Sequence, residues 1–394
     1  MAATAAPGPA PEVVARPRRP RDRKQQIIAA AAVRFWTLGY HRVGMADIAA
    51  AVGIGPSALY RHFRSKQELL LAVLDAQLTA IENGVAAGVA DLPEHALDNR
   101  EFGALWEREA RHLPEPEHRA IRHRLRALAA RVAEAIAAEA GPGGSAELRA
   151  WAALSVVDSP THHHLDLDRA RFVALLRGAA QAVTTAALPP TTAAAPRPGP
   201  DRPVLLPATR REALLAVAIR LFGERGYPSV GLSDIGAAAG IAGPSVYNHF
   251  ESKTDILVAA LQRGNESLWM GLHHALARAA DATGALDLLV ADYTAFTLAN
   301  PHIIGILLSE VTNLPDSRRD AFRRTQLDYV AEWVALLVRS RPELDAVAAR
   351  ALVHAALSVV NDVTRVHHLQ HRPELAQETA LLARAVLRAV PAAP

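Results

Sequence analysis

One seven-residue motif, rich in side chains that donate hydrogen bonds, occurs twice in the chain. The copies read Tyr60-Arg61-His62-Phe63-Arg64-Ser65-Lys66 and Tyr247-Asn248-His249-Phe250-Glu251-Ser252-Lys253. The sequence contains no glycine-rich phosphate loop after a strand, no G-x-S-x-G and no H-E-x-x-H. Cysteine is absent, so thiolate nucleophiles and thiolate metal ligands are excluded. The motifs therefore indicate binding chemistry, and we expect a protein that is not an enzyme.

The other concentration of chemically versatile residues is a run of three histidines, His162 to His164, flanked by Asp158, Asp166 and Asp168. Consecutive residues on a helix point about 100° apart, so three adjacent imidazoles do not chelate one ion while the helix persists. The second half of the chain has Arg365-Val366-His367 at the matching places, which breaks any shared ligand set. We expect a solvated helix end with no metal and no cofactor.

The motif belongs to a longer repeat. Nine residues of the first half, Phe35, Gly39, Tyr40, Val43, Gly44, Asp47, Ile48, Gly53 and Ile54, recur at one constant offset as Phe222, Gly226, Tyr227, Val230, Gly231, Asp234, Ile235, Gly240 and Ile241. At 394 residues the chain exceeds the size at which one core stops growing. Aromatic residues make up 5%, and extended β-branched runs are missing. We predict an all-α chain with two versions of one design.

The elements that must position each motif can be read from periodicity. Ile28, Ala31, Ala32 and Phe35 are spaced i, i+3, i+4 and i+7, which predicts a helix over about 24–38, ended by Gly39. Short helices then follow over about 45–52 and 56–62, on either side of a turn at residues 53–55. Two short helices around a glycine turn predict a helix-turn-helix, and the second copy repeats the pattern.

These residues resemble the TetR (AcrR-type) family of transcriptional regulators, whose three-helix DNA-binding domain ends in a motif similar to Leu-Tyr-x-His-Phe-x-Ser-Lys. Both copies match, over residues 39–66 and 226–253. Gly44 and Gly231 stand where the family usually has a Thr or Ser helix cap, and glycine caps nearly as well. The resemblance implies two such modules fused in tandem and a double-stranded DNA operator as partner.

A helix that enters the major groove presents small or polar side chains to the bases, while phosphate contacts fix its register. The candidates for base contacts are Gly55, Ser57, Ala58 and Arg61 in the first copy and Gly243, Ser245 and Asn248 in the second. The resemblance implies backbone contacts from Tyr60, His62, Lys66, Tyr247, His249 and Lys253. The alternative is that the tyrosines and histidines are half-buried helix residues and each lysine merely starts the next helix.

The two recognition helices differ at one position that bears on sequence preference. Arg61 favours guanine, whereas its counterpart Asn248 favours adenine. We hypothesise that the modules bind different half-sites, about one helical turn apart. The expected core anchors of the two motifs are Phe63 and Phe250.

The resemblance and the composition together suggest six segments. They are a disordered basic arm (residues 1–22), a first helix-turn-helix domain (23–66), a first helical regulatory domain (67–186), a proline-rich linker (187–207), a second helix-turn-helix domain (208–253) and a second helical regulatory and ligand-binding domain (254–394). An arginine-rich arm ahead of a DNA-binding helix is either a solvated tail or a contact to phosphate or the minor groove.

The resemblance also implies a small-molecule pocket in the helical domains. Candidates for its lining in the second module are Trp269, Met270, Tyr293, Phe296, Tyr329 and Trp333, although helical aromatic residues often belong to the core. The first module is shorter between about residues 74 and 97, where it lacks roughly half of the helix over residues 286–293. We therefore expect the pocket in the second module.

The last helices of each module, about residues 150–183 and 350–390, would pair between two subunits in the family. Because both halves lie on one chain, we expect an intramolecular pseudo-dimer. The function that follows is a ligand-responsive repressor acting on two half-sites. The alternative is a homodimer in which one module contacts DNA and the other is a ligand-binding or dimerisation scaffold.

Charge and hydropathy are compatible with this interpretation. Net charge is +3 and the pI is near 9.4, so DNA binding depends on where the arginines lie. The N-terminus lacks the apolar run of a signal peptide, and no segment approaches roughly 18 uninterrupted apolar residues. We expect a cytoplasmic protein with no membrane partner. The effector, the operator, the regulated genes and the sign of regulation are left open by the sequence.

Overall fold

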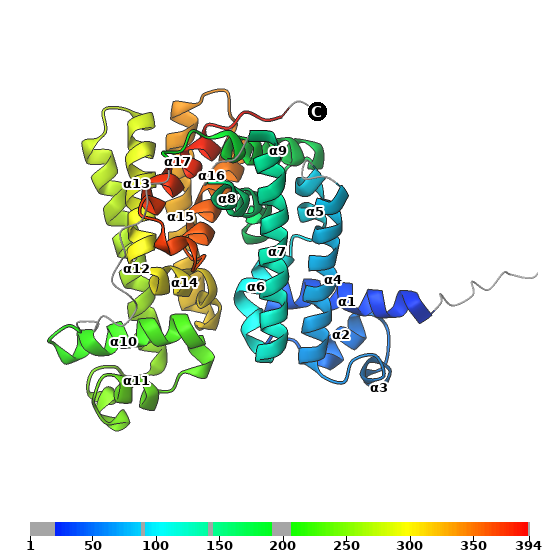
Figure 1. Ribbon diagram of the computed structural model, residues 1–394. Coiled ribbons are helices and arrows are strands. Elements are labelled where there is room, and N and C mark those ends of the chain that lie inside the picture. Colours follow the sequence, from blue (N-terminus) through cyan, green and yellow to red (C-terminus); the bar gives the residue numbers. More distant parts are fainter. Residues whose placement is uncertain (1–19, 88–90, 141–144, 191–205, 393–394) are drawn as a thin grey trace, which may run out of the picture. The chain divides into compact units, whose positions relative to one another are not determined.

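The computed structural model describes residues 20–87, 91–140, 145–190 and 206–392. Every regular element in these ranges is a helix, as the sequence predicts (Figure 1). The chain divides into two compact units, Met1–Val73 and Leu74–Pro394. The expected basic arm and the expected linker lie mostly outside the described residues.

The first unit contains α1 (Pro20–Leu38), α2 (Met45–Ala51), α3 (Pro56–Tyr60) and the beginning of α4 (Lys66–Ala87). Its core includes the predicted stripe of α1 together with residues from each following helix: Phe35, Ile48, Leu59 and Phe63 are at most 1% exposed. Gly39 ends α1 at φ 84°, and Gly53 turns the chain between α2 and α3 at φ 69°. These positive φ values favour glycine.

The second unit begins with the body of the first module. After the rest of α4 come α5 (Leu92–Asp98), α6 (Phe102–Glu109), α7 (Glu115–Ala140), α8 (Ala146–Asp158) and α9 (Arg169–Thr185). The first module is predicted to lack residues between about 74 and 97, and the structure places this difference in α4 and α5. α4 has 22 residues where its counterpart α12 (Lys253–Arg278) has 26, and α5 has 7 where α13 (Ala282–Ala299) has 18.

The second module begins with α10 (Arg210–Arg225), α11 (Leu232–Ala238) and the 3-10 helix η5 (Gly243–Asn248), ahead of α12. An α-helix is expected at η5, because α3 occupies the matching place in the first copy. Gly243 and Val246 stand where α3 has Pro56 and Leu59. Glycine and β-branched residues favour the α-helix less than leucine does, which accounts for the difference.

The body of the second module continues with α13, α14 (Pro301–Ser309), α15 (Asp316–Ser340), α16 (Ala346–Val363) and α17 (Leu375–Leu387). Helices α8 and α9 of the first module pack against α16 and α17 of the second (Figure 1). One hydrophobic cluster joins them, with Val156 and Leu176 from the first module and Leu352 and Val386 from the second. The last helices of the two modules thus share one buried core within the chain.

Two helices satisfy the length and apolarity of a membrane span, namely α4 over Lys66–Ala86 and α16 over Ala346–Val363. Neither helix is an uninterrupted apolar run of about 18 residues, which is the criterion by which the sequence predicts no membrane span. For α16, 72% of the apolar window is buried inside the protein, compared with 50% for α4. Packing in the bundle thus accounts for the apolar character of α16.

Two buried imidazoles face each other where the end of α8 meets α16. The rings of His163 and His354 lie 4.4 Å apart, and the ring of Phe172 stacks on His163 at 5.9 Å. Burial lowers the pKa of His163 to about 2 and that of His354 to about 3. The nearby charges of His162 and of Arg100 and Arg350 act in the same direction. Both rings are therefore neutral in the folded protein.

This pair predicts that the protein loses stability in mild acid. Below pH about 6.5 the unfolded chain protonates both histidines, whereas the folded chain does not. The free energy of unfolding should fall by roughly 1.4 kcal/mol per pH unit for each histidine between pH 6 and pH 4. Urea unfolding at several pH values measures the slope. The variant His163→Asn/His354→Asn should have a shallower slope, and an unchanged slope would contradict the assignment.

Candidate nucleic-acid interface and small-molecule cavity

The first helix-turn-helix presents four of the predicted residues on its outer side. Gly55, Ser57 and Arg61 are exposed, and Tyr60 is 51% exposed although it follows the fully buried Leu59. No described atom lies within 4 Å of the place that a Cβ would take on Gly55. Such a surface can approach another molecule closely. The two remaining helix candidates, Ala58 and His62, are half-buried at its edge.

The second helix-turn-helix presents fewer of its candidates. Tyr247 is 60% exposed and Asn248 is exposed, while Ser245 and His249 are half-buried. Gly243 does not face outward: a Cβ there would lie 3.1 Å from the Cα of Ser233 in α11. The close packing of η5 on α11 gives this glycine a structural reason, and its contact with bases stays a prediction.

Lys66 and Lys253, the two lysines expected to bind phosphate, make contacts inside their own domains. The Nζ of Lys66 donates to the carbonyl oxygens of Tyr40 (2.8 Å) and Val43 (3.1 Å) and lies 4.2 Å from the centre of the Tyr40 ring. The second copy repeats this arrangement. There the Nζ of Lys253 donates to the carbonyls of Tyr227 and Val230, at 2.9 Å each, and lies over the Tyr227 ring. These ammonium groups tie the start of α4 or α12 to the loop after the first helix, which favours a structural role over the expected phosphate contact.

Removal of this lysine should weaken the fold rather than the charge contacts with DNA. Lys253→Gln leaves two carbonyl groups without their charged donor, and we expect a loss of about 1–3 kcal/mol in the free energy of unfolding. Thermal or urea unfolding measures the loss. The slope of log affinity against log salt should stay the same when DNA binding is measured on the folded fraction. A slope reduced by about one unit would instead assign the ammonium group to a phosphate.

The surfaces of the two copies differ in charge more than the Arg61 and Asn248 pair alone indicates. The exposed arginines Arg42, Arg61 and Arg64 of the first copy correspond to the exposed residues Ser229, Asn248 and Glu251 of the second. Sequence reasoning considered only the middle pair, although the constant offset of the repeat identifies all three. The first copy therefore has three cations at its surface where the second has two neutral residues and one anion.

A buried carboxylate holds the second helix-turn-helix against the helical bodies. Glu310, which follows α14, is 1% exposed. Its carboxylate accepts hydrogen bonds from Arg111 Nη1 (2.5 Å), from Asn313 Nδ2 (2.7 Å) and from the backbone N–H of Tyr227 (3.3 Å). Tyr227 follows α10 and its cap residue Gly226, so the contact links the first module's Arg111 to the loop of the second DNA-binding domain. The sequence reading did not identify this network.

A cavity of about 510 Å³ lies in the body of the first module. Its walls come from α4, α5, α6, α7 and α8, with further residues from the end of α16 and the segment after it. The six predicted ligand residues of the second module are not among its lining. This cavity lies in the first module, and the pocket expected in the second module stays a prediction.

The predicted aromatic residues are occupied elsewhere. The rings of Tyr293 and Tyr329 pack against Trp333 at 5.8 and 6.2 Å, and Tyr293 donates to Asn361 at 2.8 Å. Trp269 lies 5.8 Å from Tyr329. Met270 is 58% exposed, and Phe296 packs against the core around α10. In the first module α5 has 7 residues where α13 has 18, and this short helix lines the cavity.

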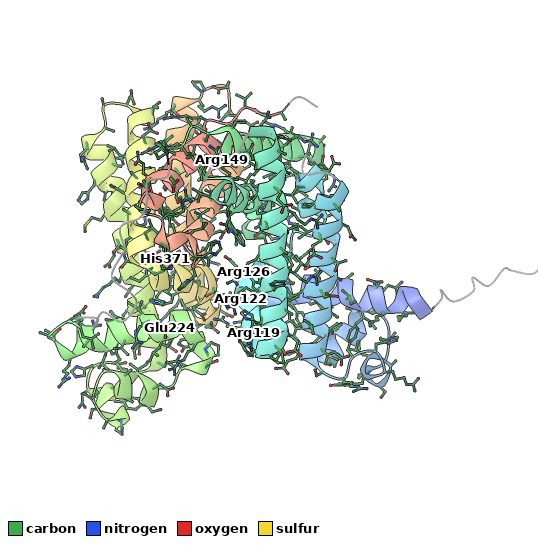
Figure 2. The ribbon with its side chains drawn as sticks, viewed as in Figure 1. Arg119, Arg122, Arg126, Arg149, Glu224 and His371 are labelled. Carbon is green, nitrogen blue, oxygen red and sulfur yellow. The ribbon has the colours of Figure 1, made fainter. Side chains whose placement is uncertain are left out.

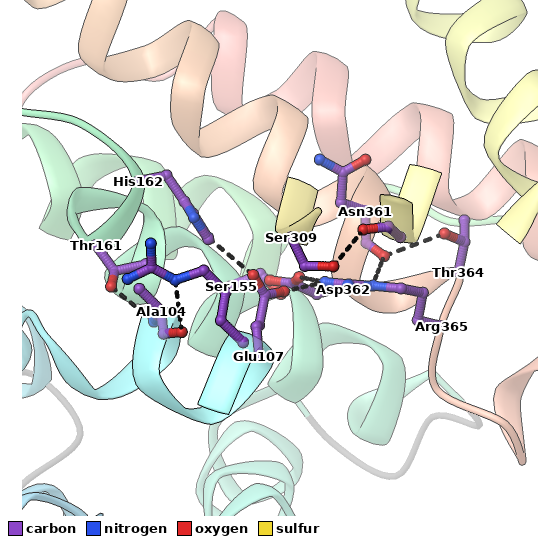
Figure 3. Close-up of polar contacts among 12 residues, drawn as sticks. Ala104, Glu107, Ser155, Thr161, His162, Ser309, Asn361, Asp362, Thr364 and Arg365 are labelled. Carbon is purple, nitrogen blue, oxygen red and sulfur yellow. Dashed lines mark hydrogen bonds and ion pairs between the residues drawn. The ribbon is translucent and has the colours of Figure 1, made fainter. Parts of the chain in front are cut away.

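One side of the cavity is a network of ionisable groups from both modules (Figure 3). Arg365 binds the carboxylates of Glu107 and Asp362, and His162 lies 3.9 Å from Glu107. Burial would raise the pKa of Glu107, but the charges of Arg365 and His162 lower it. Burial raises the pKa of Asp362, and it raises that of Asp158 well above the usual range. Glu107 and Arg365 thus compensate each other's charge, whereas burial opposes the charged form of Asp158 and of Asp362.

Comparison with known proteins assigns both helix-turn-helix segments. Residues 27–73 and 214–260 match the family described as bacterial regulatory proteins, tetR family. The HTH-type transcriptional activator FasR of Mycolicibacterium smegmatis is 40% identical over 85 residues, covering 21% of this chain and 37% of FasR. The HTH-type transcriptional repressor KstR2 of Rhodococcus jostii is 32% identical over 129 residues, covering 32% of this chain and 63% of KstR2. The chain thus spans less than two thirds of either relative.

Solved structures of the same kind are also similar. A TetR-family regulator from Bordetella parapertussis has a TM-score of 0.41 at 19% identity, covering 45% of this chain and 93% of that one. The TetR-family regulator PfmR from Thermus thermophilus has a TM-score of 0.41 at 23% identity, covering 46% of this chain and 98% of PfmR.

Proposed function

Two domains of the tetR family of bacterial regulatory proteins stand in tandem in this chain, and we propose that it is a ligand-responsive repressor that binds two half-sites as a single-chain pseudo-dimer. The observation that carries the proposal is the repeated outer surface of the two domains. In each copy an exposed Tyr60 or Tyr247 directly follows a fully buried residue of the recognition segment. The buried neighbour fixes the position of the exposed tyrosine, whose side chain can then contact the DNA backbone.

The packing of α8 and α9 on α16 and α17 supports the pseudo-dimer. The apolar faces of these helices are buried within one chain, which leaves less apolar surface for pairing with a second chain. The covalent connection also replaces association by an intramolecular step of high effective concentration. Light scattering should give a particle of one 42.1 kDa chain. A particle of twice that mass would favour the homodimer.

The proposal also includes the sign of regulation, which we take to be repression. KstR2 is named a repressor and FasR an activator, so the relatives support regulation of transcription in either sense. We assign the cavity of the first module to the effector, which would favour one conformation of the bodies by binding it more tightly. Such a protein acts on operator DNA in the cytoplasm. A promoter–reporter assay with and without the regulator tests the sign.

The charge difference between the two copies favours a second candidate. In that alternative the first module supplies nearly all DNA contacts, and the second, with Ser229, Asn248 and Glu251 in place of three arginines, serves as a scaffold. Footprinting separates the two candidates. Protection over two half-sites supports the pseudo-dimer, whereas protection over one half-site that survives changes in the second motif supports the alternative.

A further inference from the structure

We propose that the cavity of the first module binds an amphipathic organic anion, in which one carboxylate-like group is joined to an apolar body. The inference rests on the proposed function, because this ligand would be its effector. It concerns the chemistry of the cavity, which can be tested without DNA.

The apolar part of the ligand is indicated by the wall of the cavity. Ile81, Leu92, Phe102, Leu128 and Trp151 line it from α4, α5, α6, α7 and α8. A volume of about 510 Å³ lies within the range that holds a small organic molecule. Burial of such a body removes apolar surface from water and supplies most of the affinity.

The charged part is indicated by two arginines of α7. Arg122 and Arg126 are four residues apart, about one helical turn, and both line the cavity. Figure 2 shows them along α7 together with Arg119. Within the described residues, neither Arg122 nor Arg126 forms an ion pair with a carboxylate, and Arg122 instead contacts His118 Nδ1 at 2.9 Å. Both cations are thus available to an anion.

His118 adds a neutral donor beside these cations. Because a guanidinium group only donates, the Nδ1 of His118 accepts from Arg122, and the ring carries its proton on Nε2. Its ring stacks on Trp106 at 5.1 Å. Burial and the charge of Arg122 lower the pKa of His118, which agrees with a neutral ring. A stacked donor next to two arginines suits a planar oxyanion.

The carboxylates in the cavity do not neutralise this charge. Glu107 and Asp362 are held by Arg365, and burial raises the pKa of Asp158 and of Asp362. The remaining cation of the lining, Arg111, binds Glu310 outside this group. Arg122 and Arg126 are therefore the two arginines of the lining that no carboxylate pairs with in the described residues, which favours an anionic ligand over a cationic one.

Arg111 connects the cavity to the second DNA-binding domain. It lines the cavity and also binds Glu310, which accepts a hydrogen bond from the N–H of Tyr227. An anion that attracts Arg111 weakens its hold on Glu310 and loosens the loop after α10. Binding in the first module would in this way be coupled to the second helix-turn-helix.

Calorimetry with three probes of one chain length tests the charge preference. Decanoate, decan-1-ol and decylammonium are titrated separately into the full chain below their aggregation concentrations. We expect decanoate to bind at least tenfold more tightly than either other probe. Equal or tighter binding of decylammonium, or no binding of decanoate, would overturn the proposal.

Variants of α7 test the residues. Arg122→Gln/Arg126→Gln should lower the affinity for decanoate tenfold or more, and Arg122→Lys/Arg126→Lys should retain most of it. Arg119→Gln is the matched control, because Arg119 is exposed on the same helix, pairs with Glu115 at 3.5 Å and does not line the cavity. An equal loss in the control would overturn the assignment. A gel shift on the same samples reports DNA binding, so that failure of the proposed function is seen separately.

Discussion

Replacement of Arg42, Arg61 and Arg64 together by glutamine is expected to lower the affinity for DNA by roughly 100- to 1,000-fold at 0.1 M salt, because up to three phosphate or base contacts are lost. All three side chains are exposed on the first helix-turn-helix. The slope of log affinity against log salt should become shallower by up to about 2.7 units. Fluorescence anisotropy with a labelled duplex at several salt concentrations measures both quantities.

The second copy supplies the matched control. Ser229→Arg/Asn248→Arg/Glu251→Arg places cations at the corresponding exposed positions and should strengthen binding and steepen the salt slope. Glu251→Gln alone removes one anion and should have a smaller effect in the same direction. If the glutamine variant of the first copy kept both its affinity and its salt slope, the first recognition surface would not be the main DNA contact.

Loss of the buried carboxylate at Glu310 should have the largest effect on stability. Glu310→Gln leaves Arg111 without its anion and weakens the acceptor for the N–H of Tyr227. Breaking a buried pair typically removes about 3–5 kcal/mol of stability. The side chain of Arg111 is 29% exposed, so solvent screens part of the penalty and we expect about 2–4 kcal/mol. Urea unfolding measures the change.

Hydrogen exchange would locate the damage. Amides of the loop at residues 227–231 should exchange faster in Glu310→Gln, because this loop loses its anchor while α10 keeps its own core. Glu212→Gln is the control: Glu212 also forms a close pair, with Arg263 at 2.5 Å, but both side chains are at least one third exposed. Comparable destabilisation by the two changes would contradict a special role for Glu310.

The local sequence pattern predicted the architecture because the same pattern occurs in both copies, so each copy supports the interpretation of the other. The stripe that contains Phe35, the turn glycines Gly39 and Gly53, and the anchor Phe63 each act within a few residues of their own position, so spacing alone reveals their roles. The two modules and the lost half of a helix followed from the alignment of the copies.

The site was less predictable because its contacts join distant segments. The sequence does not distinguish a lysine that binds phosphate from one that donates to nearby backbone carbonyls. Lys66 donates to the carbonyls of Tyr40 and Val43. The missing part of α5 predicts that the pocket lies in the second module, but the cavity of the first module lies beside this shortened helix. Glu310 meets Arg111 across 199 positions, and no local periodicity records such a contact.

Selection of binding sites from random duplexes, followed by measurement of the mass of the complex, tests the central claim most directly. The account predicts two unlike half-sites bound by one chain of 42.1 kDa, with guanine preferred under Arg61 and adenine under Asn248. A perfect palindrome bound by two chains would contradict it, because one module would then read both half-sites and the pairing would be between molecules.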